Sequence, residues 1–311
     1  MPPLIYILIN FIIGGLICLD LAEPGDNNGY RDIMFYNGKY LAIGTEGRID
    51  YISSSGEKTT VISTTGNNLN CIAVENQVVI VGGDKGTILF SSDGKIFSRV
   101  ESGINANING ITCKNELFIA VADRGTILIS KNGSTWSSIK SEAKGNIVSV
   151  TANDSFFIGV TEMGEILTSK DGIDWKIQDY NKEYSGYNRS CVFRKVFAAN
   201  NWIVIIGKHN DDSPAVLFST LGNVWSERTL IYEDDNGMMK YLSNEPNAIT
   251  YDAIRDQFIL ACDKGEIFTL PSCSKCNVSE KISDSDLYAI TCTGNLLICV
   301  GREFSVKALN F

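Results

Sequence analysis

Residues that could do chemistry gather in three irregular stretches in the second half of the chain, 179–190, 208–214 and 232–247. They contain tyrosines, whose rings suit sugars and protein surfaces, and carboxylates, which suit Ca²⁺, a basic partner or acid–base work in glycoside hydrolysis. We therefore predict that a protein- or glycan-binding site is built from Tyr180, Tyr184, Tyr187, His209, Asp211, Asp212, Glu233, Asp234, Asp235 and Tyr241.

Other reactive side chains are too isolated to indicate catalysis. His209 is the only histidine, so neither a catalytic dyad of histidines nor a histidine-rich metal site is expected. Cys273 and Cys276 have the spacing of half a zinc site, but no second pair follows, which favours a local disulfide. We predict no catalytic residue, no metal and no cofactor, and we keep a glycoside hydrolase with paired carboxylates as the alternative.

Composition limits the class of partner. The 311 residues are 44% apolar, which is enough for a large core, and they have a net charge of -9 with a pI of about 4.8. Nucleic acid and anionic membrane surfaces would be repelled by this charge. We expect a monomer that binds a neutral or basic protein or a glycan.

The N-terminus is predicted to direct export. Residues 1–22 contain no charge before Asp20, and such a run at the start of a chain is typical of a signal peptide or signal anchor. The alternative is a buried strand formed by the sequence IYILINF. We predict one domain over residues 23–311, secreted or extracytoplasmic, with membrane contact only through an uncleaved residue 1–22 segment.

The cysteines and the N-glycosylation sequons can be compared with what an exported protein would contain. Removal of Cys18 with the signal would leave eight cysteines, an even number that suits disulfides. Cys113 and Cys292, however, share one repeat position where a small buried residue is expected, so some cysteines are predicted to be unpaired. In a eukaryotic secretory route, the glycan acceptors would be Asn132, Asn153, Asn188 and Asn277.

A repeated unit must position these residues. Residues 110–136 and 149–175 are two copies of one pattern, and four glycines, Gly47, Gly86, Gly125 and Gly164, follow at steps of 39. The apolar runs are only four or five residues long and rich in β-branched and aromatic types, which favours strands. A period of this size with four short strands predicts a β-propeller.

The repeats divide the chain into seven four-stranded antiparallel blades, with six blades as the fallback. The last blade supplies only three strands, so its outer strand is predicted to come from residues 18–28. The turn between the second and third strands lies on the same face as the link to the next blade. The three irregular stretches belong to that face in blades four to six, and we expect them to meet there.

A short motif, S-x-[DN]-G-x-x-[WF], occupies the turn between the third and fourth strands. Asp or Asn caps the turn, Gly adopts a positive φ, and the aromatic ring covers the blade. We interpret these residues as structural. They are Ser91, Asp93, Gly94, Phe97, Ser130, Asn132, Gly133, Trp136, Ser169, Asp171, Gly172 and Trp175.

With these motifs, residues 30–311 resemble the Asp-box (BNR) repeat β-propellers, and the wording GTI-L-S-x-[DN]-G-x-x-W is similar to the photosystem II assembly-factor type. The resemblance implies that the box is structural and covers sialidases, some endo-glucanases, sortilin-type receptors and many proteins that only bind. Sialidases need three convergent arginines and a Tyr/Glu pair, but Asp follows Arg31, and Arg194 lies in Phe-Arg-Lys. An assembly factor implies an arginine patch, whereas the arginines here lie among acidic neighbours. We therefore predict an exported, non-enzymatic binding module.

Overall fold

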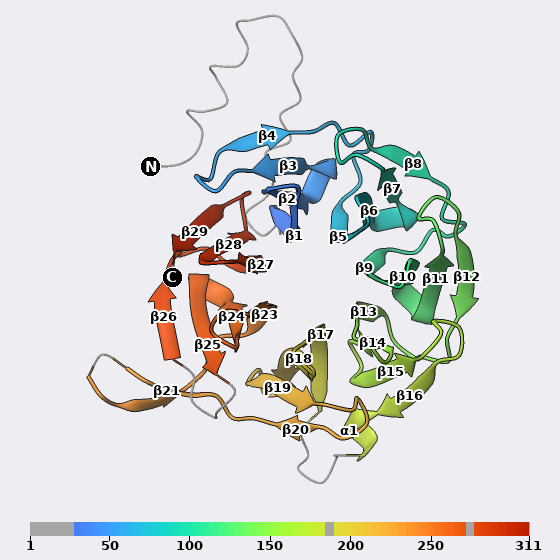
Figure 1. Ribbon diagram of the computed structural model, residues 1–311. Helices are drawn as coiled ribbons and strands as arrows, with labels where there is room; N and C mark the ends of the chain where they lie inside the picture. The colour runs from blue at the N-terminus through green and yellow to red at the C-terminus, as the bar shows by residue number, and fades with distance from the viewer. Residues whose placement is uncertain (1–27, 184–189, 235, 272–276, 311) are drawn as a thin grey trace, which may run out of the picture.

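The computed structural model describes residues 28–183, 190–234, 236–271 and 277–310. It shows seven antiparallel sheets arranged radially around a central opening (Figure 1). The predicted seven-bladed β-propeller is confirmed. Six sheets have four strands in consecutive order and, within the described ranges, the seventh has three.

Strands with the same place in each blade have similar lengths and surroundings. The innermost strands are β1 (Tyr30–Tyr36), β5 (Leu69–Glu75), β9 (Ile108–Lys114), β13 (Ile147–Ala152), β17 (Cys191–Ala199), β23 (Pro246–Asp252) and β27 (Leu287–Thr293). The second strands are β2 (Lys39–Gly44), β6 (Val78–Gly83), β10 (Leu117–Ala122), β14 (Phe157–Thr161), β18 (Trp202–His209), β24 (Gln257–Cys262) and β28 (Leu296–Gly301). The third strands are β3 (Ile49–Ile52), β7 (Ile88–Ser91), β11 (Thr126–Ser130), β15 (Glu165–Ser169), β19 (Pro214–Ser219), β25 (Glu266–Pro271) and β29 (Val306–Asn310). The outer strands are β4 (Lys58–Thr60), β8 (Ser98–Val100), β12 (Ser137–Lys140), β16 (Lys176–Asp179), β20 (Ser226–Glu227) and β26 (Asn277–Lys281).

Hydrophobicity falls from the second strand outward because only the inner strands are covered on both faces. The second strand of blade three, LFIAVA, is buried at five of its six positions. Its outer strand, SSIK, is exposed at three of four positions. An unbroken apolar run is therefore required where two neighbouring blades enclose a strand, and a polar strand is tolerated at the rim.

The core consists of seven separate clusters, each shared by two adjacent blades. The cluster that closes the ring packs Tyr30 and Ala42 of blade one against Ile298 and Val300 of blade seven. A single blade cannot bury its apolar faces alone, so the stability of each blade depends on both neighbours.

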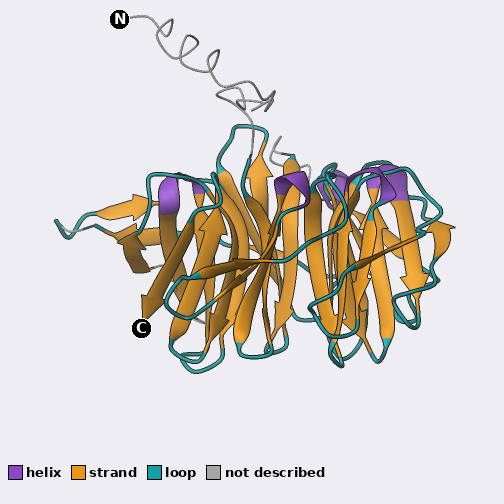
Figure 2. Ribbon diagram, turned by 90° about the horizontal axis from the view of Figure 1, so that it is seen from above, coloured by secondary structure: helices purple, strands orange, loops and turns teal. Residues whose placement is uncertain are grey.

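The two faces of the ring differ in their turns. Short 3-10 turns, η2 (Thr45–Gly47), η3 (Asp84–Gly86), η4 (Asp123–Gly125) and η6 (Asp263–Gly265), join second to third strands. Figure 2 shows the helical turns on one side of the ring, which we call the link face. The backbone N–H groups of Lys85 and Arg124 in these turns donate to the side-chain oxygens of Asn107 and Asn146 of the next blade, at 3.1 and 2.9 Å. These hydrogen bonds join blade two to blade three and blade three to blade four.

The first and last blades are joined by backbone contacts. Gly29 forms an isolated bridge with Arg302, and the Glu303 N–H donates to the Asn28 carbonyl at 2.7 Å. The predicted signal segment, residues 1–22, and all but residue 28 of the predicted closing strand lie outside the described residues. No helix in the described part of the chain is long and apolar enough to cross a bilayer.

The box turns define the opposite face, the box face, and share one hydrogen-bond pattern. In blade three, Ser130 Oγ accepts from the Gly133 N–H at 2.9 Å, and Asn132 Oδ1 accepts from the Thr135 N–H at 2.9 Å. The Trp136 indole donates to the Gly133 carbonyl at 2.8 Å. Gly133 has φ +72°, which glycine adopts without strain.

No two of the six described cysteines form a disulfide, and four of the six are buried: Cys71, Cys191, Cys262 and Cys299. Burial raises the pKa of Cys71 and Cys299, which keeps both in the unreactive thiol form. Within the described chain, the even cysteine count therefore does not reflect disulfides. The predicted Cys273–Cys276 pair lies outside the described residues.

Candidate binding surfaces

The structure places Tyr180 inside the protein, which corrects its prediction as a binding residue. Tyr180 begins α1 (Tyr180–Glu183), is 6% exposed, and packs its ring 5.7 Å from that of Phe193. The ring fills the gap between blades four and five, so a ligand has no access to it. Tyr184 and Tyr187 lie outside the described residues.

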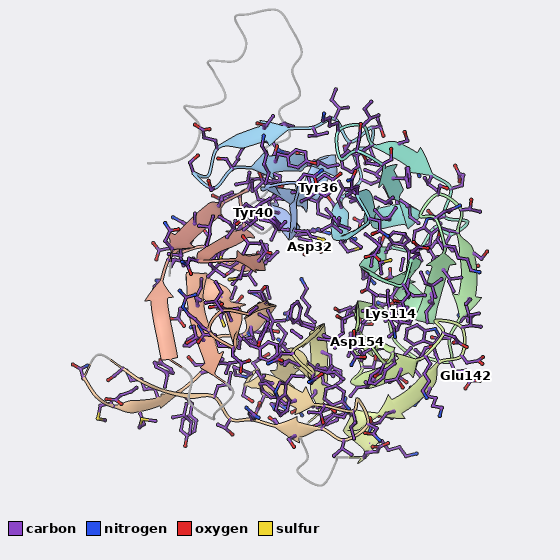
Figure 3. The ribbon with its side chains drawn as sticks, viewed as in Figure 1. Asp32, Tyr36, Tyr40, Lys114, Glu142 and Asp154 are labelled. Atoms are coloured by element: carbon purple, nitrogen blue, oxygen red, sulfur yellow. The ribbon has the colours of Figure 1, made fainter. Side chains whose placement is uncertain are left out.

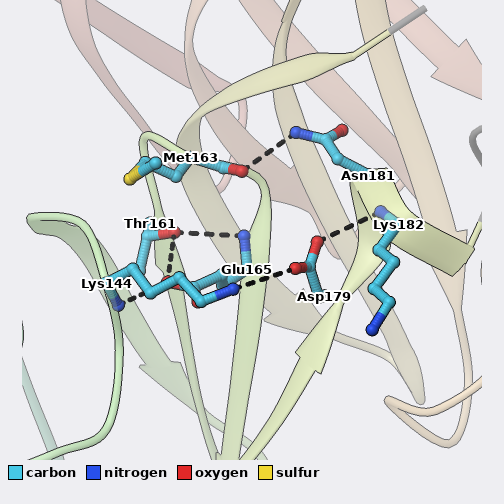
Figure 4. Close-up of polar contacts among 7 residues, drawn as sticks. All are labelled: Lys144, Thr161, Met163, Glu165, Asp179, Asn181 and Lys182. Carbon is cyan, nitrogen blue, oxygen red and sulfur yellow. Dashed lines mark hydrogen bonds and ion pairs between the residues drawn. The ribbon is translucent and has the colours of Figure 1, made fainter. Parts of the chain in front are cut away.

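The polar residues around α1 hold the link in place (Figure 4). Asp179 accepts from the Lys182 N–H at 3.1 Å and lies 3.4 Å from the Lys144 ammonium. The Asn181 amide donates to the Met163 carbonyl at 2.9 Å. The 3%-exposed carboxylate of Glu165 accepts from the Lys144 N–H at 2.9 Å. These contacts fix the conformation of the link around α1.

His209 is also buried, at 3% exposure, which corrects the prediction that it contributes to a binding surface. Its Nδ1 lies 3.4 Å from Cys191 Sγ and its Nε2 lies 2.6 Å from Glu227 Oε1. A thiol, an imidazole and a carboxylate in sequence are the parts of a nucleophilic site. Cys191 is only 2% exposed, so a substrate cannot reach the sulfur.

Asp211 and Asp212 are exposed on the link face, in the turn between β18 and β19. Asp212 pairs with Lys208 at 2.6 Å, and Lys208 also lies 3.9 Å from Glu245 of the stretch 232–247. The stretches 208–214 and 232–247 therefore meet as expected, and the stretch 179–190 joins them where the Asn210 N–H donates to the Ser190 carbonyl at 2.9 Å. The carboxylates of Asp212 and Glu245 are partly neutralised by the lysine that they share.

The stretch 232–247 forms a hairpin where an irregular link was expected. Strands β21 (Ile231–Glu233) and β22 (Met239–Tyr241) pair with each other and with no blade. Figure 1 shows β21 standing out from the ring beside β26. We call residues 231–241 the arm; Asp235 within it lies outside the described residues.

The arm is fixed at both ends. At its base, buried Leu230 and Leu242 join the cluster between blades five and six, and the Tyr232 ring lies 5.6 Å from Phe268. At its turn, Asp234 Oδ1 accepts from the Met238 N–H at 2.9 Å, and Asp234 Oδ2 lies 2.7 Å from the Lys240 ammonium. The lysine and backbone donors lower the pKa of Asp234 to about 2.

Three large apolar side chains on the arm face solvent. Met238 is 63% exposed, Met239 is 55% exposed and Tyr241 is 68% exposed. Glu233 is exposed beside them. Sequence reasoning identified Tyr241 and Glu233 but missed the methionines. The consecutive Met-Met pair inside a short polar stretch was the signal that would have found them.

A second candidate site lies on the axis of the ring. A cavity of about 880 Å³ is lined by all seven innermost strands. Each of these strands has a β-bulge at the same position, near the link face. The extra residue of each bulge lines the cavity: Arg31, Asn70, Asn109, Val148, Arg194, Asn247 and Tyr288.

The bulge residues are held by their surroundings. Asn70, Asn109 and Asn247 each donate to an aspartate of the adjacent 3-10 turn, at 2.7 to 2.9 Å. Arg194 pairs with Glu245, and Arg31 donates to Asn70. Sequence reasoning set Arg31 and Arg194 aside because no sialidase motif surrounds them. Aligning the seven inner strands would have shown that both occupy the bulge position.

An ion pair crosses the axial cavity between the residues that directly follow the bulge residues of blades one and five. Lys195 of blade five lies 3.6 Å from Asp32 of blade one. Figure 3 shows Asp32 at the inner edge of its blade, beside the central opening. Asp32 also accepts backbone N–H groups from Ile33 at 3.0 Å and Ile72 at 3.1 Å.

Comparison with known proteins shows the fold. No family model and no curated protein matches the chain. A solved structure of YCF48 bound to D1 peptide is 13% identical, covers 92% of this chain and 95% of its own, and superposes with a TM-score of 0.68. YCF48 from Cyanidioschyzon merolae is 16% identical, with coverages of 93% and 97% and a TM-score of 0.67. The WD40 β-propeller domain of Doa1 is 12% identical, with coverages of 91% and 93% and a TM-score of 0.66.

Proposed function

We propose that this protein is a non-enzymatic binding module that holds a protein partner through its arm. The observation that carries the proposal is the exposure of Met238, Met239 and Tyr241 on a hairpin that projects from the ring. Large apolar side chains gathered at one exposed place are typical of interaction sites, and tyrosine is enriched among binding hot spots.

The arm is suited to binding because it is fixed before contact. Its base is packed into the ring, and Asp234 ties its turn. Less freedom is therefore lost when a partner docks. Methionines adapt to irregular apolar surfaces, which favours a protein groove over a sugar ring.

Charge and structural likeness support a protein partner. The net charge of -9 favours a partner with basic groups around its apolar groove. YCF48 bound to D1 peptide is a propeller of similar fold that holds a polypeptide. We further assign the chain to the Asp-box propellers, with residues 23–311 as one domain and residues 1–22 as an export signal or anchor. That assignment rests on the shared box-turn geometry and on the uncharged N-terminal run.

No observation favours the glycoside hydrolase alternative. A general acid in glycoside hydrolysis needs a raised pKa, whereas the pKa of Asp234 is lowered to about 2. Asp212 is tied to Lys208 in an ion pair. Asp235 lies outside the described residues.

The test compares an arm variant with a variant whose three side chains have similar exposed fractions. M238S/M239S/Y241S removes the arm's apolar side chains. I173S/L221S/V224S removes three side chains of the box face that are 56%, 69% and 65% exposed. Both immobilised variants and the wild type are incubated with extract of the producing cells, and bound proteins are quantified by mass spectrometry.

We expect a partner that the wild type and the box-face variant retain equally and that the arm variant loses. If every protein bound by the wild type is retained equally by the arm variant, the arm is not the docking surface. Circular dichroism melting curves of the three proteins establish that all are folded.

A further inference from the structure

One sector of the axial cavity is basic in a molecule of negative net charge. The lining contains Arg31, Arg194 and Lys195 together with Asp32 and Glu162, and Arg194 is neutralised by Glu245. Arg31, Lys195 and Asp32 give their sector a formal charge of +1. The whole chain has a net charge of -9. A basic sector enclosed by protein walls concentrates anions relative to the surrounding surface.

The guanidinium of Arg31 has N–H donors available for a ligand. Its guanidinium donates to the amide oxygen of Asn70, and no carboxylate of the described chain forms an ion pair with it. A guanidinium has five N–H donors in a planar fork that matches a carboxylate or phosphate. Arg194, in contrast, is already paired with Glu245.

Lys195 is held loosely. Its ammonium lies 3.6 Å from Asp32, beyond the roughly 2.7–2.9 Å of a charge-assisted hydrogen bond. The carboxylate of Asp32 is fixed by the N–H groups of Ile33 and Ile72, so it stays in place when the lysine moves. Arg31 and Asp32 are consecutive residues of one bulge, which places the guanidinium and the ammonium in one sector of the cavity.

The positions that match Asp32 and Lys195 in blades two, three and four also line the cavity and have small side chains, which leaves room beside this pair. They are Cys71, Gly110 and Ser149. The cavity volume of about 880 Å³ lies within the range of roughly 300–1,000 Å³ that is typical of small-ligand sites.

We propose that the axial cavity binds a small molecule with a carboxylate or phosphate group, and that Arg31 and Lys195 hold this group. Arg31 binds the oxyanion through its planar fork, and Lys195 leaves Asp32 to contact the same group. Asp32 competes with the ligand for Lys195 and so lowers the affinity of the cavity for the ligand. This site is separate from the arm.

The test is calorimetric titration of the purified protein with citrate, with inorganic phosphate and with uncharged glucitol at constant ionic strength. We expect citrate or phosphate to bind and glucitol not to bind. Binding of citrate alone identifies a carboxylate ligand, and binding of phosphate alone identifies a phosphate ligand. Absence of binding by both anions overturns the proposal.

Four variants locate the site. R31Q and K195Q are each expected to weaken anion binding at least tenfold, and D32N is expected to strengthen it several-fold because it frees Lys195. R99Q removes an exposed charge from outer strand β8 and is expected to leave binding unchanged. The assignment is contradicted if R31Q and K195Q both bind the anion with wild-type affinity. It is also contradicted if R99Q weakens anion binding as much as they do, or if D32N does not bind the anion more tightly than the wild type. If R31Q fails to fold, the proposal is decided by K195Q, which should lose anion binding, and by K195R, which should keep it.

Discussion

Replacing Tyr30 with phenylalanine tests how much its hydroxyl stabilises the seam, the contact between blades one and seven that closes the ring. Tyr30 is fully buried in blade one, and its hydroxyl donates to Asp50, which also lies 2.6 Å from Nε of Arg48. Its ring meets Phe304 of blade seven edge-on at 5.1 Å. Y30F keeps the ring contact and removes only the hydroxyl, so it isolates one hydrogen bond to a buried carboxylate.

The expected cost follows from that hydrogen bond. Loss of a hydrogen bond to a charged group costs about 1.5–3 kcal/mol. In a domain of this size, each kcal/mol lowers the melting temperature by roughly 2–4 °C. We therefore expect Y30F to melt roughly 3–12 °C below the wild type, from the product of these two ranges.

The same variant has a defined pH dependence. Burial, followed by the hydrogen bond to Asp50, raises the pKa of Tyr30 above its ordinary value of 10.0. Above pH 10 the unfolded wild type releases a proton that the folded protein keeps, so its stability falls as the pH rises. Phenylalanine has no such proton. The stability difference between the wild type and Y30F should therefore narrow above pH 10.

The assay is denaturant unfolding at pH 7 and at several values above pH 10, with Y251F as the matched control. Tyr251 also donates its hydroxyl to an aspartate, but that partner, Asp256, is exposed. We expect Y251F to cost less than about 0.5 kcal/mol, as surface changes usually do. The role of the Tyr30 hydroxyl would be refuted if Y30F and Y251F lowered the free energy of unfolding equally. It would also be refuted if the stability difference between the wild type and Y30F stayed constant above pH 10.

Three further predictions concern the box face, the thiols and the arm. G133A and G38A both place alanine at positive φ, but only at Gly133 would the new Cβ meet another side chain, so G133A should cost at least about 1 kcal/mol more in denaturant unfolding. Mass-mapped alkylation with iodoacetamide should leave Cys71 unmodified in the folded protein and modify it after unfolding, because the thiol is buried. D234N should lower the hydrogen-exchange protection of the arm at pH 7, while the wild-type arm should lose that protection only as the pH falls through about 2. Equal arm protection in the two proteins at pH 7 would contradict the role of Asp234 in tying the turn.

The blades were predictable from sequence because their pattern is local and repeated. Gly86 and Gly125 recur at a step of 39 in turns that the structure places at one position of successive blades. The short apolar runs between them correspond to buried second strands such as β10. Turn chemistry and strand length are set by neighbouring residues, so one sequence is sufficient to recognise them.

The surfaces were less predictable because they depend on contacts between blades. Tyr180 and His209 lie in loop-like sequence, yet both are buried. Tyr180 packs between blades four and five, and His209 lies between Cys191 and Glu227 of blade five. Lys195 and Asp32 are far apart in the chain and meet only because the ring closes. The hairpin of the arm is difficult to predict from sequence because its strands have only three residues each.

The most direct test of the arm as a docking surface is the equilibrium Kd of the captured partner for the wild type, the arm variant and the box-face variant. Full burial of a large apolar side chain is worth about 1.5–3 kcal/mol, and somewhat more than half of each arm side chain is exposed, so each should contribute about 1 kcal/mol. We expect M238S/M239S/Y241S to raise the Kd about a hundredfold and I173S/L221S/V224S to leave it unchanged. A Kd for the arm variant within about twofold of the wild type, a difference of only about 0.4 kcal/mol, would contradict the proposal.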